Sequence, residues 1–200
     1  VTSLLHRIET MENGICCKPV LSFDERGHQR NDMIYYVLGS DENGDKPEGF
    51  FPTVESFIGE SGSFIAPEAV AYKKNGCKAG TSFDGKEAVG AFAFPEVTLE
   101  SGAQKEYIVV SGMAESRNEV TRTAEAFRTK AQTDEAFAKT KTYWNQLVNI
   151  SFETGDPKED NYLKWICFQP ILRRIYGCSF LPYHDYGRGG RGWRDLWQDC

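Results

Sequence analysis

Residues 186–200 have the sequence Tyr186-Gly-Arg-Gly-Gly-Arg-Gly-Trp-Arg-Asp-Leu-Trp-Gln-Asp-Cys200. The four glycines of this stretch let the backbone take positive φ or approach a ligand closely. Its three arginines are planar hydrogen-bond donors, its two aspartates are acceptors, and its two tryptophans are flat apolar surfaces. Sugars need this combination, because their hydroxyl groups pair with charged groups while their C–H face packs on an aromatic ring. The stretch therefore predicts a carbohydrate-binding loop.

Two other interpretations of the stretch are open. An arginine- and glycine-rich run is typical of a disordered nucleic-acid-binding arm. Residues 194–199, however, resemble the start of a helix, and the whole chain has a net charge of −6, which opposes binding to phosphate backbones. A loop held together by arginine–aspartate pairs of purely structural value is not excluded by the residues themselves.

The same residues resemble the signature of the inverting phosphorylases of glycoside hydrolase family 94, among them cellobiose, chitobiose and 1,2-β-oligoglucan phosphorylases. The shared pattern is Gly187-Arg188-Gly189, then Gly192-Trp193-Arg194-Asp195, then Gln198-Asp199. Trp193 stands where the family more often has phenylalanine, and the preceding loop is longer than in cellobiose phosphorylase. The stretch is most similar to the 1,2-β-oligoglucan branch.

The resemblance implies a hexosyltransferase that cleaves β-linked gluco-oligosaccharides with inorganic phosphate as co-substrate, needs no other cofactor and releases α-glucose 1-phosphate. It implies that Arg188, Arg194 and Asp195 hold the sugar at the non-reducing end. The remaining predicted substrate-binding residues are Gln169, Arg173, Arg174 and Asp199. Which of the two neighbouring arginines contacts the sugar is left open. The general acid is expected after Cys200, so no catalytic residue is assigned in the chain.

Two alternative functions remain open at this point. An inverting glycoside hydrolase with a similar helical barrel would need a carboxylate base to activate water, whereas a phosphorylase can omit it because phosphate is already an anionic nucleophile. A non-catalytic carbohydrate-binding β-sandwich is the third possibility, and the Arg191-Gly-Trp-Arg-Asp195 segment argues against it.

Composition narrows the partners further. The acidic pI of about 5.2 disfavours binding to nucleic acid and to anionic membranes. The sequence contains no run of about eighteen apolar residues, so it predicts no membrane span. The six cysteines form no C-x-x-C pair and the three histidines are scattered, so we expect no metal site. We interpret the cysteines as free thiols in a reducing compartment, which predicts a cytoplasmic protein.

The chain divides into three predicted parts. Short β-rich runs separated by turn signals predict an antiparallel β-sandwich over residues 1–115. Residues 116–152 are predicted to be a helical linker, and residues 153–200 the first part of an (α/α)6 catalytic barrel, as the resemblance implies. Because the sequence starts with Val1 and stops inside the signature, we expect an internal fragment of a larger enzyme.

Within residues 1–115 the expected strands are 33–38, 63–65, 69–72, 89–94, 97–99 and 106–111. A loop is expected at 39–44. A cluster of Phe50, Phe51 and Phe57 could be a platform for sugars, but buried core is the better interpretation. Short runs of sequence around these residues also resemble the family. In that family the β-sandwich helps to shape the active site of the partner in a dimer, so the resemblance implies a homodimer.

Helix start signals follow the sheet region. Ser116 and Glu119 form a capping-box pattern, and a second helix is expected from about Thr133. A third is expected from Pro157, capped by Asp156.

The third helix carries an unusual face. Trp165, Gln169 and Arg173 share it, and a buried arginine or glutamine must be paired or must line a polar space. A pocket for carbohydrate and a structural salt bridge explain this face equally well.

Overall fold

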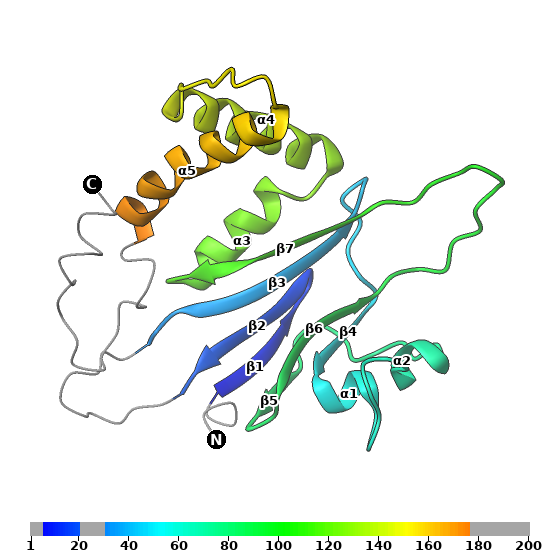
Figure 1. The fold of residues 1–200 in the computed structure, drawn as a ribbon. Helices are drawn as coiled ribbons and strands as arrows, with labels where there is room; N and C mark the ends of the chain where they lie inside the picture. Colours follow the sequence, from blue (N-terminus) through cyan, green and yellow to red (C-terminus); the bar gives the residue numbers. More distant parts are fainter. Residues whose placement is uncertain (1–5, 21–30, 177–200) are drawn as a thin grey trace, which may run out of the picture. The chain divides into compact units, whose positions relative to one another are not determined.

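The computed structural model describes residues 6–20 and 31–176, and for residues 170–176 it describes the backbone alone (Figure 1). The described residues fall into two compact units that divide after Ala136. The first unit holds the β-sheets, the helices packed on them and the start of the fourth helix, and the second holds the rest of that helix and the fifth. Each unit is described by itself.

The first unit contains two antiparallel sheets. The larger has five strands in the order β5-β1-β2-β3-β7 and the smaller pairs β4 with β6. The strands are β1 His6–Met11, β2 Gly14–Pro19, β3 Ile34–Asp41, β4 Gly49–Thr53, β5 Ser82–Asp84, β6 Ala88–Ala93 and β7 Tyr107–Ala114. Two short helices, α1 Val54–Ile58 and α2 Glu68–Ala71, follow β4.

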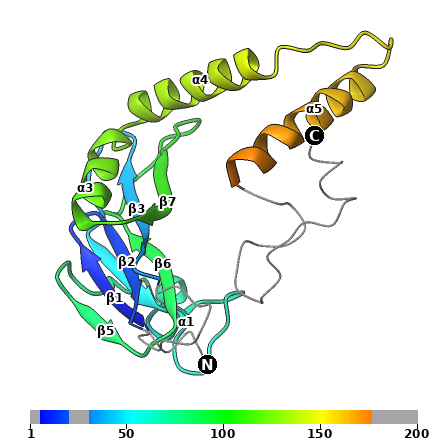
Figure 2. The same cartoon turned by 90° about the vertical axis from the view of Figure 1, so that its left-hand side faces the viewer.

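Helix α3, Arg117–Ala126, packs against β3 and β7 on one face of the large sheet (Figure 2). Side chains alternate between the two faces of a strand, so every second residue can be directed at this helix. The core between helix and sheet consists of Cys16, Leu38, Ala114, Val120 and Ala124. Val120 is fully buried, and its burial fixes the position of the helix on the sheet.

The opposite face of the large sheet packs against the β4–β6 pair. Ile8, Ile15 and Phe50 form this second core, and the rings of Phe50 and Phe92 meet edge to face with centroids 6.0 Å apart. Glycine is required at Gly39, since a Cβ there would lie 2.8 Å from the Phe92 ring. The sequence prediction of antiparallel sheets followed by helices is confirmed.

Three strand predictions are wrong for identifiable reasons. Residues 69–72 lie mostly in helix α2, which starts directly after Pro67, a residue compatible with a helix start. Residues 63–65 contribute only an isolated bridge from Ser63 to Ala66. Residues 97–99 belong to no described strand, because β propensity alone cannot form a strand without a neighbour to pair with.

The predicted loop at 39–44 is also partly wrong. Strand β3 continues to Asp41, where Gly39, Ser40 and Asp41 pair with Val109, Ile108 and Tyr107. The turn is shorter than expected, and it places Gly44 at φ +91°.

The helix start signals perform better. Ser116 Oγ accepts a hydrogen bond from Glu119 N at 3.3 Å, as predicted. The Glu119 carboxylate accepts from Glu115 N at 2.9 Å, whereas in a full capping box it would accept from Ser116 N, one residue later. Helix α4 is Lys130–Leu147, beginning three residues before the predicted Thr133.

Helix α5, Pro157–Tyr176, begins where the sequence predicts. The Asp156 carboxylate accepts a hydrogen bond from Lys158 N at 2.9 Å, which satisfies one free backbone donor of the first turn. An (α/α)6 barrel containing this helix stays a prediction.

Candidate functional site

Most predicted substrate-binding side chains lie outside the described residues. This applies to Arg188, Arg194, Asp195 and Asp199. Arg173 and Arg174 lie on α5, of which only the backbone is described at those positions, and Gln169 lies one turn earlier on the same helix with a half-buried side chain. Their assignment to a sugar site therefore stays a prediction.

A groove between α4 and α5 lies beside this part of α5, inside the second unit. Its volume is about 330 Å³. The lining residues are Trp144, Asn145, Val148, Asn161, Lys164, Trp165 and Phe168. A groove of this size with aromatic walls and a few amide groups has the chemistry to accept a sugar ring or an apolar side chain.

Three aromatic rings form the wall of the groove. Trp144 and Phe168 meet at 77° with centroids 4.6 Å apart, and Trp165 lies 5.4 Å from Phe168 at 32°. The Lys164 ammonium donates to the Asn145 amide oxygen at 3.4 Å across the two helices. Trp165 is 53% exposed, and whether the face that it shares with Gln169 and Arg173 binds a sugar stays a prediction.

The phenylalanine cluster of the sheet unit is core, as predicted for Phe50 and Phe51, which are 2% and 4% exposed. Phe57 is half-buried and meets the Phe51 ring with centroids 6.0 Å apart. These rings are occupied with one another and with the sheets, so they do not form an exposed sugar platform.

A buried carboxylate organises the turn after β3. Asp41 is 6% exposed and accepts hydrogen bonds from Asn43 N at 2.9 Å, Asp45 N at 2.8 Å and Lys105 Nζ at 2.6 Å. Burial alone would raise the pKa of Asp41, but the Lys105 ammonium and the two backbone donors hold this pKa below its ordinary value. Lys105 also donates to Glu42 at 3.0 Å, so this lysine joins two carboxylates of the turn.

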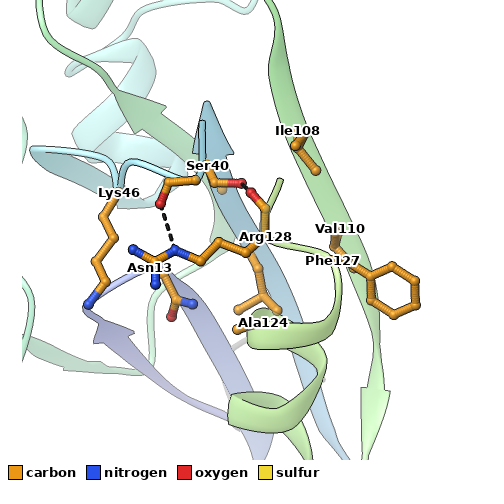
Figure 3. Close-up of a pocket in the computed structure, with 11 residues that line it drawn as sticks. Asn13, Ser40, Lys46, Ile108, Val110, Ala124, Phe127 and Arg128 are labelled. Carbon is orange, nitrogen blue, oxygen red and sulfur yellow. Dashed lines mark hydrogen bonds between the residues drawn. The ribbon is translucent and has the colours of Figure 1, made fainter. Parts of the chain in front are cut away.

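Next to this turn is a small cavity, of about 10 Å³, which has room for about one water molecule (Figure 3). Its lining residues are Asn13, Leu38, Gly39, Ser40, Gly44, Lys46, Ile108, Val110, Ala124, Phe127 and Arg128. The cavity is far too small for a sugar, so we assign it no substrate.

The cysteines that the structure describes are free thiols: Cys16, Cys17, Cys77 and Cys167. Burial, with a smaller effect of the neighbouring Cys17, raises the pKa of Cys16 to about 11, so this thiol stays protonated and unreactive near neutral pH. Within residues 6–20 and 31–176 no group of His, Cys, Asp and Glu side chains could hold a metal ion. No helix in those ranges combines the length and apolar character needed to cross a bilayer.

Sequence reasoning missed the Asp41–Lys105 pair and the ring contacts of Trp144 with Phe168. Asp41 and Lys105 are 64 residues apart, and no local pattern links them. The aromatic residues of the groove were visible as apolar positions of two helices, but their partners depend on how those helices pack.

Comparison with known proteins gives one finding. Residues 8–130, more than half of the chain, match the family model described as Glycosyl hydrolase 94, supersandwich domain. This range contains α3 and both sheets except for the first two residues of β1. No curated protein matches the chain.

Proposed function

The chain belongs to glycoside hydrolase family 94, a family of glycoside phosphorylases, and from this premise we propose that it is an inverting phosphorylase of β-linked gluco-oligosaccharides. The observation that carries the proposal is the family match of the sheet domain, residues 8–130, which the signature at residues 187–199 supports independently. The similarity of that signature to the 1,2-β-oligoglucan branch favours β-1,2-linked glucans as substrates.

The proposed reaction is a single displacement. A general acid protonates the glycosidic oxygen as the bond to C1 breaks, while a phosphate oxygen forms the new bond to C1 from the opposite face. The products are α-glucose 1-phosphate and the shortened oligosaccharide. Phosphate replaces the activated water of a hydrolase, so no second carboxylate is needed.

In this proposal Arg188, Arg194 and Asp195 bind hydroxyl groups of the terminal sugar. Their hydrogen bonds position C1 in line with phosphate, and those that strengthen in the transition state accelerate the reaction. Gln169, Asp199 and one of the two arginines at the end of α5 complete the site.

The requirement for phosphate tests the proposal. The intact protein, incubated with β-linked gluco-oligosaccharides, should cleave them in phosphate buffer and not in a phosphate-free buffer of the same pH and ionic strength. Equal release of free sugar without phosphate would instead establish the hydrolase.

We further propose that the protein forms a homodimer through the connection between β6 and β7. Residues 95–104 of this connection are almost entirely exposed and extend away from the sheets, and they include Val97 and Leu99 at 45% and 53% exposure (Figure 1). Its base is held by Phe94 and Tyr107, whose ring centroids are 4.5 Å apart. The ring contact fixes the start of the connection, and the exposed apolar side chains beyond it are suited to packing against a second copy of the chain.

The dimer makes a simple prediction. Sedimentation equilibrium of the intact protein should give twice the mass of one chain, and Val97→Ser with Leu99→Ser should lower that mass because they remove apolar contact area. A wild-type protein that sediments as a monomer at micromolar concentration would contradict the assignment.

The reducing, cytoplasmic compartment is also a proposal. It is supported by the four described free thiols, while Cys178 and Cys200 lie outside the described residues.

A further inference from the structure

The connection between α3 and α4 consists of three residues, Phe127–Thr129. A short non-helical break between two helices is where a hinge is ordinarily found, because a few backbone dihedrals there can absorb a large change in direction. The two compact units, however, divide after Ala136, inside α4 and not at the break. Side-chain and backbone contacts hold the break against the sheet unit.

Arg128 is tied to the turn after β3 at two points. The Ser40 hydroxyl donates to the Arg128 carbonyl at 2.6 Å, and Arg128 Nε donates to the Gly44 carbonyl at 2.7 Å; both bonds are drawn in Figure 3. Gly44 lies so close that a Cβ on it would be 3.0 Å from the Arg128 side chain. The centre of the break is therefore bonded to the sheet through both its backbone and its side chain.

The first residue of α4 is bonded to the same turn and to the residue before β7. Lys130 N donates to the Glu42 carbonyl at 3.1 Å, and the Lys130 ammonium lies 2.8 Å from the Glu106 carboxylate at the start of β7. Hydrogen bonding to Glu106 is the main reason that the pKa of Lys130 is raised.

Gln132 joins the two helices directly. Its side-chain oxygen accepts from Arg128 N at 3.1 Å and Thr129 N at 2.9 Å, and so satisfies two donors at the start of α4. Its side-chain nitrogen donates to the Glu125 carbonyl, in the last turn of α3, at 3.0 Å. One amide group thus spans the break.

The turn that receives these bonds is itself rigid. The buried Asp41 carboxylate binds two backbone donors of the turn and the Lys105 ammonium. A change of direction at the break would have to disrupt hydrogen bonds to a turn that Asp41 and Lys105 hold in place.

We propose that residues 127–132 form a fixed joint: the first turns of α4 move with the sheet unit as one body. The joint holds a helix direction through hydrogen bonds between elements that are distant in sequence. It is independent of which sugar the enzyme uses.

Limited trypsin digestion of the intact native protein tests the joint, since trypsin cleaves after arginine and lysine and needs a locally mobile backbone. The bond after Arg128 should resist cleavage, although the Arg128 side chain is 40% exposed. The bond after Lys73, whose side chain is 85% exposed, serves as an internal reference and should be cleaved faster. Gln132→Ala should accelerate cleavage after Arg128 about tenfold or more and leave cleavage after Lys73 unchanged.

The matched control is Glu55→Gln. It weakens an exposed ion pair elsewhere in the sheet unit, in which Lys86 Nζ lies 2.7 Å from the Glu55 carboxylate, and it should leave the rate of cleavage at both sites unchanged. Wild-type cleavage after Arg128 as fast as after Lys73 would overturn the joint, as would a Gln132→Ala protein that is cleaved like wild type. Equal acceleration at both sites would also count against it, because the substitution would then act on the whole sheet unit.

Discussion

Asp195→Asn in the intact enzyme is expected to lower kcat/KM for phosphorolysis about thirty- to a thousand-fold. The substitution keeps the shape of the side chain but replaces one acceptor oxygen with a donor, which in the proposed role of Asp195 would leave a sugar hydroxyl without its acceptor. Loss of such a charge-assisted hydrogen bond costs about 2–4 kcal/mol of transition-state stabilisation. Initial rates of sugar phosphate release, measured over a range of oligosaccharide concentrations, give the ratio.

The control for this variant is the same substitution at an exposed position, Asp84→Asn in β5, which should leave kcat/KM unchanged. Circular dichroism should show that both variants are folded. An Asp195→Asn enzyme as active as wild type would make Asp195 a structural partner of the neighbouring arginines and not a substrate ligand.

Phe50→Ala is expected to lower the free energy of unfolding by about 3–5 kcal/mol, because truncation of a buried phenylalanine loses burial and leaves a cavity. Phe50 is 2% exposed, belongs to the core with Ile8 and Ile15, and meets the Phe92 ring edge to face. A domain stability is ordinarily about 5–15 kcal/mol, so this single change removes a large fraction of it. Urea unfolding followed by circular dichroism measures the difference.

Phe64→Ala is the matched control for the core substitution. Phe64 is 61% exposed, so its truncation should change the free energy of unfolding by less than about 1 kcal/mol. If the two variants unfold at the same urea concentration, Phe50 does not hold the two sheets together.

The parts of the fold that the sequence predicted well depend on local chemistry. Ser116 and Asp156 are side-chain caps that act within three residues, so their helix starts are visible without knowledge of the fold. Phe50 and Phe51 were recognised as core because large aromatic side chains in a sheet domain are usually buried. The β1–β2 hairpin has no comparable local signal: its two-residue turn is Glu12-Asn13, because Gly14 already pairs with Met11, so the Asn13-Gly14 dipeptide does not fill the turn positions.

The parts that could not be predicted depend on contacts between distant segments. Residues 97–99 have the composition of a strand, but pairing depends on a neighbour that the sequence does not specify. The fixed joint needs Lys130 to meet Glu42 and Glu106, and the pairing of β3 with β7 brings those two glutamates together. The sugar site was predicted from the similarity of one stretch to a family signature, and all of its predicted side chains except that of Gln169 lie outside the described residues.

The configuration of the first product tests the proposed function most directly. Proton and phosphorus NMR should be recorded from the start of a reaction of the intact protein with β-1,2-, β-1,3- and β-1,4-linked gluco-oligosaccharides in phosphate. We predict that α-glucose 1-phosphate is the only sugar phosphate formed, because one displacement at a β-linked C1 inverts its configuration. Initial formation of β-glucose 1-phosphate, or of free glucose in place of any sugar phosphate, would contradict an inverting phosphorylase.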